Sequence, residues 1–180
     1  MPPMIAARIV ILSSLALATS VTAAPPVWNP KAPENRQLIA GFNADTVGGV
    51  LRSIGARYQA GGTAAAPRLL VTFPNGRKAT LLLSSCVGGS CKALSMQASW
   101  TKIANTPQPQ VADAIARFNH KYAFAKVYLS PEGNPSMQRY LTADYGFIRG
   151  DLAVNFLVFA SQAETFATEV LGPLEKKRSS

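Results

Sequence analysis

The sequence predicts an α+β domain in which an antiparallel sheet is packed by about three helices. Between residues 68 and 98, apolar and polar residues alternate in stretches separated by turn-forming residues, which indicates a meander of about three strands. A second pair of such stretches after residue 125 predicts a second hairpin. Segments 43–55, 108–124 and 150–171 repeat apolar residues at helical spacing and predict the helices.

The first helix is expected within the stretch FNADTVGGVLRSIGARY. Asn43 or Asp45 is the candidate N-cap, because short polar side chains bind the free N–H groups of a first turn. Gly48 and Gly49 weaken this helix, and Gly55 is a candidate for its end. The apolar face consists of Val47, Val50, Leu51 and Ile54.

The stretch RLLVTF, residues 68–73, is predicted to be a strand that ends in the turn PNG. Pro74 suits the first corner of a type I turn, and Gly76 suits the left-handed position that closes a three-residue loop. This loop sets Phe73 opposite Arg77 and so fixes the register of the hairpin. One face of the hairpin then holds the apolar side chains of Leu69, Val71, Phe73, Ala79, Leu81 and Leu83.

Residues 84–94, SSCVGGSCKAL, contain the only two cysteines, Cys86 and Cys91. If these two pair directly across the loop VGGS, Leu83 lies opposite Leu94 and the apolar side of the sheet continues. Directly paired residues have Cα atoms roughly 4.5 to 5.5 Å apart, which suits a disulfide. The register therefore predicts a structural disulfide at the tip of a hairpin, with both cysteines pointing away from the core.

Two other roles for the cysteines are weaker. A closed zinc site requires four ligands, whereas the chain offers two cysteines and one histidine, His120, on another element. A catalytic dithiol usually has two residues between its cysteines at the start of a helix, and this pattern is absent. A redox pair remains the alternative to the structural disulfide. His120 is expected to be an exposed or edge residue rather than a catalytic one.

The second half repeats the pattern of helix and hairpin. The helix over 108–124 places Val111, Ile115, Phe118 and Tyr122 on one stripe. Strands are expected over 126–130 and 139–144, joined by the turn PEGNPS, with Val127, Leu129, Leu141 and Ala143 toward the core. Tyr128 and Tyr140 share the opposite face, where they are expected to pack across the strands or to form a contact patch.

The last predicted helix, over 150–171, is the longest. Its apolar stripe consists of Leu152, Phe156, Phe159, Ala163, Phe166 and Val170. Val154, Leu157 and Val158 widen the apolar surface beyond that stripe. Either the helix is simply buried against the sheet, or its surplus apolar face contacts a second subunit or another partner. In the second case the candidate contact residues are Phe156, Phe159 and Phe166, together with Tyr128 and Tyr140.

The N-terminal sequence predicts export. Arg8, an apolar run over 9–18 and the small residues TSVTAA indicate a signal peptide over 1–24, cleaved after Ala23 or Ala24. The apolar run is about half of the roughly 20 residues that span a membrane, so no integral membrane segment is expected after cleavage. The expected organisation is a flexible Pro-rich leader over 25–40, the α+β domain over 41–171 and a basic tail over 172–180. The protein is therefore expected to be secreted or periplasmic.

The formal net charge of +9 falls to +8 when Arg8 is removed with the signal peptide. A basic protein favours anionic partners, but export argues against nucleic acid. The basic residues form a run only at 176–178. A solvated basic surface is the simplest interpretation, and weak binding of envelope polyanions is an alternative.

The order of elements and their motifs resemble the YbjN-like family of bacterial sensory transduction regulators. The quoted motifs are GARYQ after the first helix, PNGRK, CVGGSCKALSMQASW, and RFNHKYAFAKVYLSPEGNP, followed by a strand and the long helix. The resemblance covers about residues 40–171 and is most specific in the cysteine-glycine-cysteine hairpin. It implies a fold like that of type III secretion chaperones and no established enzymatic activity. The chain departs from the family at Arg139, which stands in a segment that is acidic in the family.

Motifs of catalysis are missing from the sequence. It contains no glycine-rich phosphate loop followed by lysine, no Gly-x-Ser-x-Gly elbow and no His-Glu-x-x-His. We therefore predict no catalytic residue, no cofactor and no metal. The favoured hypothesis is a non-enzymatic binding or regulatory module, chaperone-like or sensory, that contacts an envelope protein partner or forms a homodimer. The alternatives are a periplasmic thiol-disulfide protein that uses Cys86 and Cys91, and the weak polyanion binder.

Overall fold

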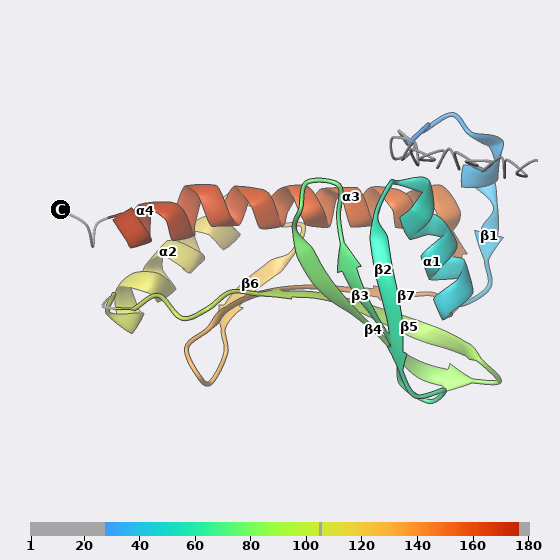
Figure 1. The fold of residues 1–180 in the computed structure, drawn as a ribbon, viewed down its shortest axis with the longest axis horizontal. Coiled ribbons are helices and arrows are strands. Elements are labelled where there is room, and N and C mark those ends of the chain that lie inside the picture. The colour runs from blue at the N-terminus through green and yellow to red at the C-terminus, as the bar shows by residue number, and fades with distance from the viewer. Residues whose placement is uncertain (1–27, 105, 177–180) are drawn as a thin grey trace, which may run out of the picture.

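The structure is a computed structural model that describes residues 28–104 and 106–176 (Figure 1). The predicted signal peptide over 1–24 lies outside the described residues. In chain order the elements are η1 (Pro33–Arg36), β1 (Leu38–Ile39), α1 (Ala44–Ser53), β2 (Arg57–Gly62), β3 (Pro67–Thr72), β4 (Lys78–Val87), β5 (Ser90–Ser99), α2 (Gln108–Lys121), β6 (Lys126–Leu129), β7 (Pro135–Thr142), β8 (Phe147–Ile148), α3 (Arg149–Phe166), η2 (Ala167–Leu171) and α4 (Gly172–Lys176).

The predicted α+β class is confirmed. Six strands form one antiparallel sheet in the order β2-β3-β4-β5-β7-β6, and the short strands β1 and β8 pair separately. In Figure 1, α3 runs along one side of the sheet, with α1 near one of its ends and α2 near the other. The buried residues of the helices and of the facing side of the sheet form one hydrophobic core. The other side of the sheet, called the open face below, has no helix over it in the described part of the chain.

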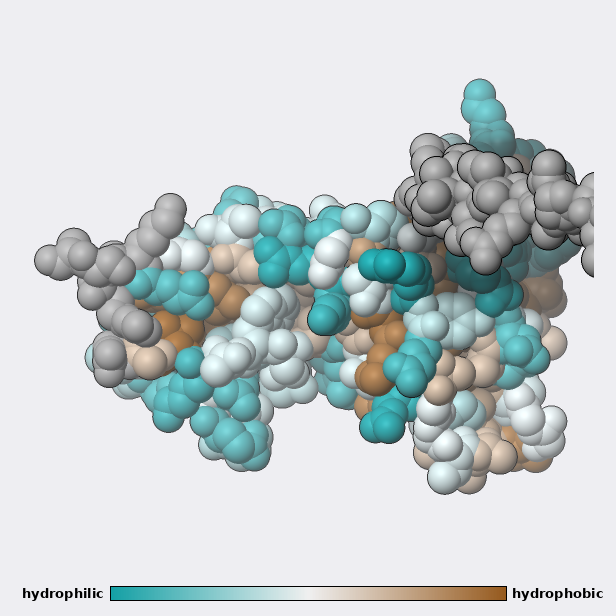
Figure 2. Space-filling view, in the orientation of Figure 1, coloured by the Kyte–Doolittle hydropathy of each residue, from teal (hydrophilic) through white to brown (hydrophobic). Residues whose placement is uncertain are grey.

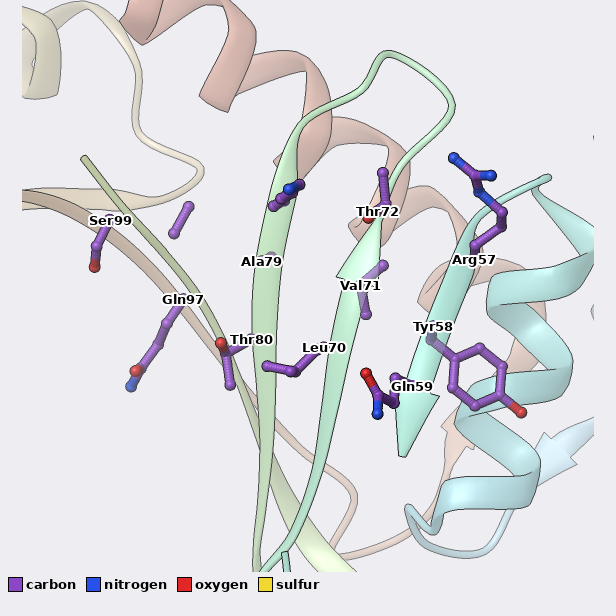
Figure 3. A pocket seen from close by; sticks show the side chains of 12 residues that line it. Arg57, Tyr58, Gln59, Leu70, Val71, Thr72, Ala79, Thr80, Gln97 and Ser99 are labelled. Carbon is purple, nitrogen blue, oxygen red and sulfur yellow. The ribbon is translucent and has the colours of Figure 1, made fainter. Parts of the chain in front are cut away.

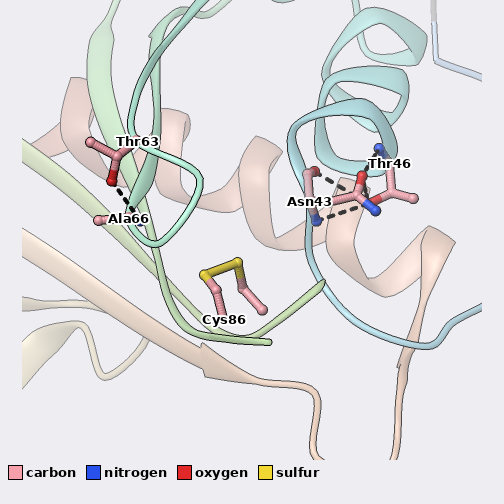
Figure 4. The surroundings of a disulfide bond; sticks show 6 residues. Asn43, Thr46, Thr63, Ala66 and Cys86 are labelled. Atoms are coloured by element: carbon pink, nitrogen blue, oxygen red, sulfur yellow. Dashed lines mark hydrogen bonds between the residues drawn. A yellow bond between two sulfur atoms is a disulfide. The ribbon is translucent and has the colours of Figure 1, made fainter. Parts of the chain in front are cut away.

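The start of α1 is the predicted one. Asn43 is the N-cap: its side chain accepts a hydrogen bond from the backbone N–H of Thr46 at 2.8 Å, and the Thr46 hydroxyl accepts one from the Asn43 N–H at 3.2 Å (Figure 4). The helix ends at Ser53, just before Gly55, whose φ of 76° is left-handed.

The two glycines of α1 are expected to respond differently to alanine. A Cβ at Gly49 would meet nothing closer than 3.7 Å, so Gly49→Ala should stabilise the protein by about 0.5 to 1 kcal/mol through helix propensity. A Cβ at Gly48 would lie 2.1 Å from the Tyr58 hydroxyl, so Gly48→Ala has to displace the ring that also binds Arg52. Gly48→Ala should therefore not show the stabilisation expected of Gly49→Ala.

Urea unfolding of both single variants measures the contrast. In a Tyr58→Ala background, which removes the obstacle, Gly48→Ala should recover the gain. Equal stabilisation by the two single variants would show that Tyr58 does not pack against α1 as described.

The predicted register of the first hairpin is confirmed. Phe73 N–H donates to the Arg77 carbonyl at 2.8 Å, and the pairs that follow include Val71 with Ala79 and Leu69 with Leu81. The turn is also tied to the long helix, because Asn75 donates from Nδ2 to the Ala160 carbonyl at 3.0 Å. Arg77 adds an ion pair with Glu164 of α3.

The Arg77–Glu164 pair gives an expected pH dependence. The hydrogen bond from Arg77 lowers the pKa of Glu164, so the pair stabilises the fold at neutral pH and loses this effect as pH falls through the lowered pKa. Glu164→Gln should therefore be slightly less stable than wild type at pH 7 and equal to it once the carboxyl is protonated. Because the pair is partly exposed, the difference should be small.

Thermal unfolding at a series of pH values measures this difference. Asp113→Asn is the matched control, since Asp113 is exposed on α2 and forms no ion pair among the described residues. A stability gap for Glu164→Gln that persists unchanged at acid pH would argue against the ion pair.

The second strand of the second hairpin starts earlier than predicted. β7 begins at Pro135, inside the predicted turn, while β6 follows the prediction. Asn119 of α2 binds both backbone groups of Val127, donating to its carbonyl at 2.8 Å and accepting from its N–H at 3.0 Å. This contact holds α2 on the edge strand β6. The predicted stripe of α2 is buried at Val111, Ile115 and Phe118, and Tyr122 is its C-cap.

Both predicted flanking segments are partly folded. In the predicted leader, Trp28 packs against the core, β1 pairs with β8, and Arg149 N–H donates to the Gln37 carbonyl at 2.9 Å. In the predicted tail, α4 continues the long helix through the π-helical turn η2, and Leu174 is buried. The described elements therefore extend beyond residues 41–171 at both ends, from η1 to α4.

Candidate functional site

The three phenylalanines predicted to contact a partner are core residues instead. Phe156, Phe159 and Phe166 are all 0% exposed. Phe166 lies 5.0 Å from the Trp100 ring and 5.1 Å from the Phe118 ring, centroid to centroid. The apolar stripe of α3 is thus satisfied by the protein's own sheet and α2, and we reassign these residues to the core.

Only a few apolar side chains of α3 outside its buried stripe are exposed to solvent. Val154 is 41% exposed, and Leu157 and Val158 are half-buried. Figure 2 shows hydrophobic colour mainly in the seam between α3 and the elements below it, with paler or hydrophilic surface beyond. The part of the long helix that is visible in this view therefore presents no broad apolar face.

The two tyrosines predicted to form a patch share a face but are separated. Tyr128 lies opposite Ser136, whereas Tyr140 lies opposite Ser95, four residues further along β7. That separation is about 13 Å along the strand. Tyr140 is 56% exposed and Tyr128 is half-buried. The predicted packing of the two rings across the strands is therefore wrong, and a contact patch would have to include the residues between them.

The structure contains the predicted disulfide between Cys86 and Cys91, whose Cα atoms are 3.8 Å apart (Figure 4). The pair is directly opposed in the β4–β5 ladder, as the register predicted. The predicted outward orientation is wrong for Cys91, which is 0% exposed. Backbone hydrogen bonds of 2.8 and 2.7 Å join it to Phe42, so the segment before α1 covers it.

The alternation rule failed at this hairpin because the strand is irregular. Ser85 has a φ of 54°, the only left-handed non-glycine residue described, and Ser85 is missing from the regular ladder. Burial of Cys91 leaves little access for a thiol attacking this sulfur, which favours a structural role over a redox role.

The remaining candidate residues are not brought together. His120 is exposed on α2, as expected, and no group of three or more His, Cys, Asp or Glu side chains in the described ranges could hold a metal ion. Arg139 lies on the helix-covered side of β7, where it donates a hydrogen bond to the Phe124 carbonyl at 2.7 Å. Its guanidinium carbon lies 4.3 Å from the centroid of the Phe124 ring.

Among the helices within residues 28–104 and 106–176, none combines the length and the apolar character that a membrane span requires.

The open face contains a candidate binding surface. A shallow hollow of about 570 Å³ lies over β2, β3, β4 and β5 (Figure 3). One row of paired residues crosses all six strands: Gln59, Leu70, Thr80, Gln97, Gln138 and Lys126. The side chains of Gln97 and Gln138 both donate to the Ser95 hydroxyl, at 3.3 and 2.9 Å, which holds the middle of the row in place.

The neighbouring row of the open face is cationic. Arg57 lies opposite Thr72, which in turn lies opposite Lys78, and we call these three residues the cation row. Both cations are exposed, and neither forms an ion pair among the described residues. The sequence reasoning missed this row because β2 was not predicted as a strand, although the β3–β4 register already put Thr72 and Lys78 on one face.

The comparisons with known proteins give one match. A family model, YbjN, described as "Putative bacterial sensory transduction regulator", matches residues 43–172, from the N-cap of α1 to the start of α4. Neither the curated proteins nor the solved structures gave a match. The match includes every strand of the six-stranded sheet, the disulfide and the open face. The chain belongs to the YbjN family.

Proposed function

We propose that this protein is an exported regulatory module that acts by binding another protein through the open face of its sheet. The observation that carries the proposal is the hollow over β2–β5, which is lined by hydrogen-bonding side chains and two exposed cations. No helix of the described residues lies over it (Figure 1). The hollow is wide and shallow, as a surface for a macromolecule would be, and contains no cluster of catalytic groups. A chaperone-like role is one form that such binding can take.

The carboxyl groups whose pKa values are lowered lie outside the hollow that is proposed to bind the partner. Catalytic groups usually have shifted pKa values inside a cleft. Here the pKa values of Glu164 and Glu169 are lowered by hydrogen bonds from Arg77 and Lys121, respectively, and these contacts join separate elements of the fold. The pKa of Glu132 is lowered by the Ser130 hydroxyl in the β6–β7 turn. None of these groups lines the hollow.

Export is supported by the N-terminal sequence and by the disulfide, since disulfides persist mainly in oxidising compartments. The test is to fractionate the source cells and sequence the N-terminus of the protein recovered from the envelope. The mature chain is expected to begin at Ala24 or Pro25 and to contain no free thiol. A full-length cytoplasmic protein with two free thiols would contradict export.

Binding to another protein is tested by affinity capture of the mature chain after chemical cross-linking in intact cells. Each captured protein is then purified and titrated against the chain, while light scattering measures whether the chain binds a second copy of itself. A reproducible partner with saturable binding is expected. A strict monomer that saturably binds none of the captured proteins would contradict the proposed function.

A further inference from the structure

We propose that the hollow of the open face recognises an extended acidic segment of the partner polypeptide, with carboxylates bound at the cation row. This inference rests on the proposed function and adds the chemistry of the partner. It is carried by the distribution of charge over the sheet, by the arrangement of the cation row and by the apolar contact beside it.

Acidic residues are absent from the six strands. The chain contains nine Asp and Glu residues, and none of them lies in β2, β3, β4, β5, β6 or β7. The strand register places four exposed cations on the open face: Arg57, Arg68, Lys78 and Lys126. Because no carboxylate neutralises them there, the open face has a positive potential that attracts anionic groups.

The cation row is arranged to share an anion. Neighbouring strands are about 4.8 Å apart, so Arg57 and Lys78 flank Thr72 at roughly 10 Å from one another. Figure 3 shows Arg57 and Thr72 at one end of the hollow. The Thr72 hydroxyl has no hydrogen-bond partner among the described residues. A carboxylate between the two cations can therefore accept from the guanidinium, the ammonium and the hydroxyl.

The next row favours a polypeptide over other polyanions. Leu70 is 48% exposed in the hollow and lies directly between Gln59 and Thr80. An acidic polypeptide can place an apolar side chain on Leu70 while its carboxylates occupy the cation row. A uronic-acid polymer has no such side chain, and the headgroups of a flat bilayer do not fit into a hollow.

The test measures binding of a short fluorescein-labelled peptide of alternating glutamate and serine with one central leucine. The same peptide with glutamine in place of glutamate is the uncharged control. Arg57→Glu and Lys78→Glu change the cation row, and Arg117→Glu makes the same charge change at an exposed position on α2. Thermal unfolding checks that all three variants are folded. Polygalacturonate and vesicles of anionic lipid are added as competitors.

The expected result is that the glutamate peptide binds, that binding weakens with added salt, and that each cation-row variant reduces affinity by about tenfold while Arg117→Glu leaves it within about twofold. The proposal is overturned if the glutamine peptide binds equally well, if Arg117→Glu loses as much affinity, or if polygalacturonate or vesicles displace the peptide at equal charge concentration. Absence of peptide binding overturns it as well. If a partner captured from cells still binds saturably in that case, the proposed function stands without this inference.

Discussion

Phe166→Ala is expected to lower the free energy of unfolding by about 3 to 5 kcal/mol, the usual cost of removing a fully buried phenylalanine ring. Phe166 is 0% exposed and contacts the rings of Trp100 and Phe118, so it joins α3 to the end of β5 and to α2. The loss would remove a large part of the stability of an ordinary domain. Urea denaturation followed by circular dichroism measures it.

Ser161→Ala on the exposed side of α3 is the matched control and should change stability by no more than about 0.5 kcal/mol. Phe166→Leu keeps most of the apolar volume and provides a folded variant if Phe166→Ala does not fold. If both Phe166 variants were as stable as wild type but lost binding to a partner, the residue would belong to an interface rather than to the core.

Cys91→Ser is expected to destabilise the protein more than Cys86→Ser. Either substitution removes the disulfide, whose short loop contributes about 2 kcal/mol in the chain-entropy model. Cys91→Ser also buries a hydroxyl at a position that is 0% exposed, where an unpaired hydroxyl costs about 1 to 3 kcal/mol more. The expected losses are therefore about 3 to 5 kcal/mol for Cys91→Ser and about 2 kcal/mol for Cys86→Ser.

Two controls separate the disulfide from the burial of its sulfur atoms. Reduction of the wild type should cost about as much as Cys86→Ser, and Cys91→Ala should be milder than Cys91→Ser because it buries no hydroxyl. Equal destabilisation by the two serine variants would contradict the burial of Cys91 beneath Phe42.

The features that sequence predicted best are those determined by local chemistry. Short polar residues predicted an N-cap at Asn43 or Asp45, of which Asn43 is the cap, and the PNG turn fixed the register of β3 with β4. Hydrophobic alternation then carried the register to the Cys86–Cys91 pair. In each case neighbouring residues specify the structure, and the tertiary contacts agree with them.

The features that sequence missed depend on tertiary contacts. β2, RYQAGG, has no apolar alternation, and five of its six residues are exposed, so its pairing to β3 determines its conformation. The described part of the leader is ordered by contacts with distant segments: β1 pairs with β8, and Trp28 packs against the hydrophobic core. The buried side of α3 is hydrophobic whether the helix contacts its own sheet or a partner, so periodicity alone could not assign Phe156, Phe159 and Phe166 to the core.

The candidate site was only half accessible from sequence. The predicted register already placed Thr80 opposite Gln97 on the side of the sheet away from the core, and that pair is confirmed. Predicting the cation row also required the β2–β3 pairing, because Arg57 lies in β2 and is placed opposite Thr72 only by that pairing. A functional surface made from one residue per strand is invisible until every strand is identified.

The most direct test of the central claim, that the open face rather than the long helix is the functional surface, is site-specific photo-cross-linking in the native envelope. A photoreactive phenylalanine derivative replaces either Leu70, exposed on the open face, or Val154, exposed on α3. The expected result is a discrete protein adduct from position 70, absent without irradiation, and none from position 154. An adduct from position 154 alone would contradict the claim and return the partner contact to the helix.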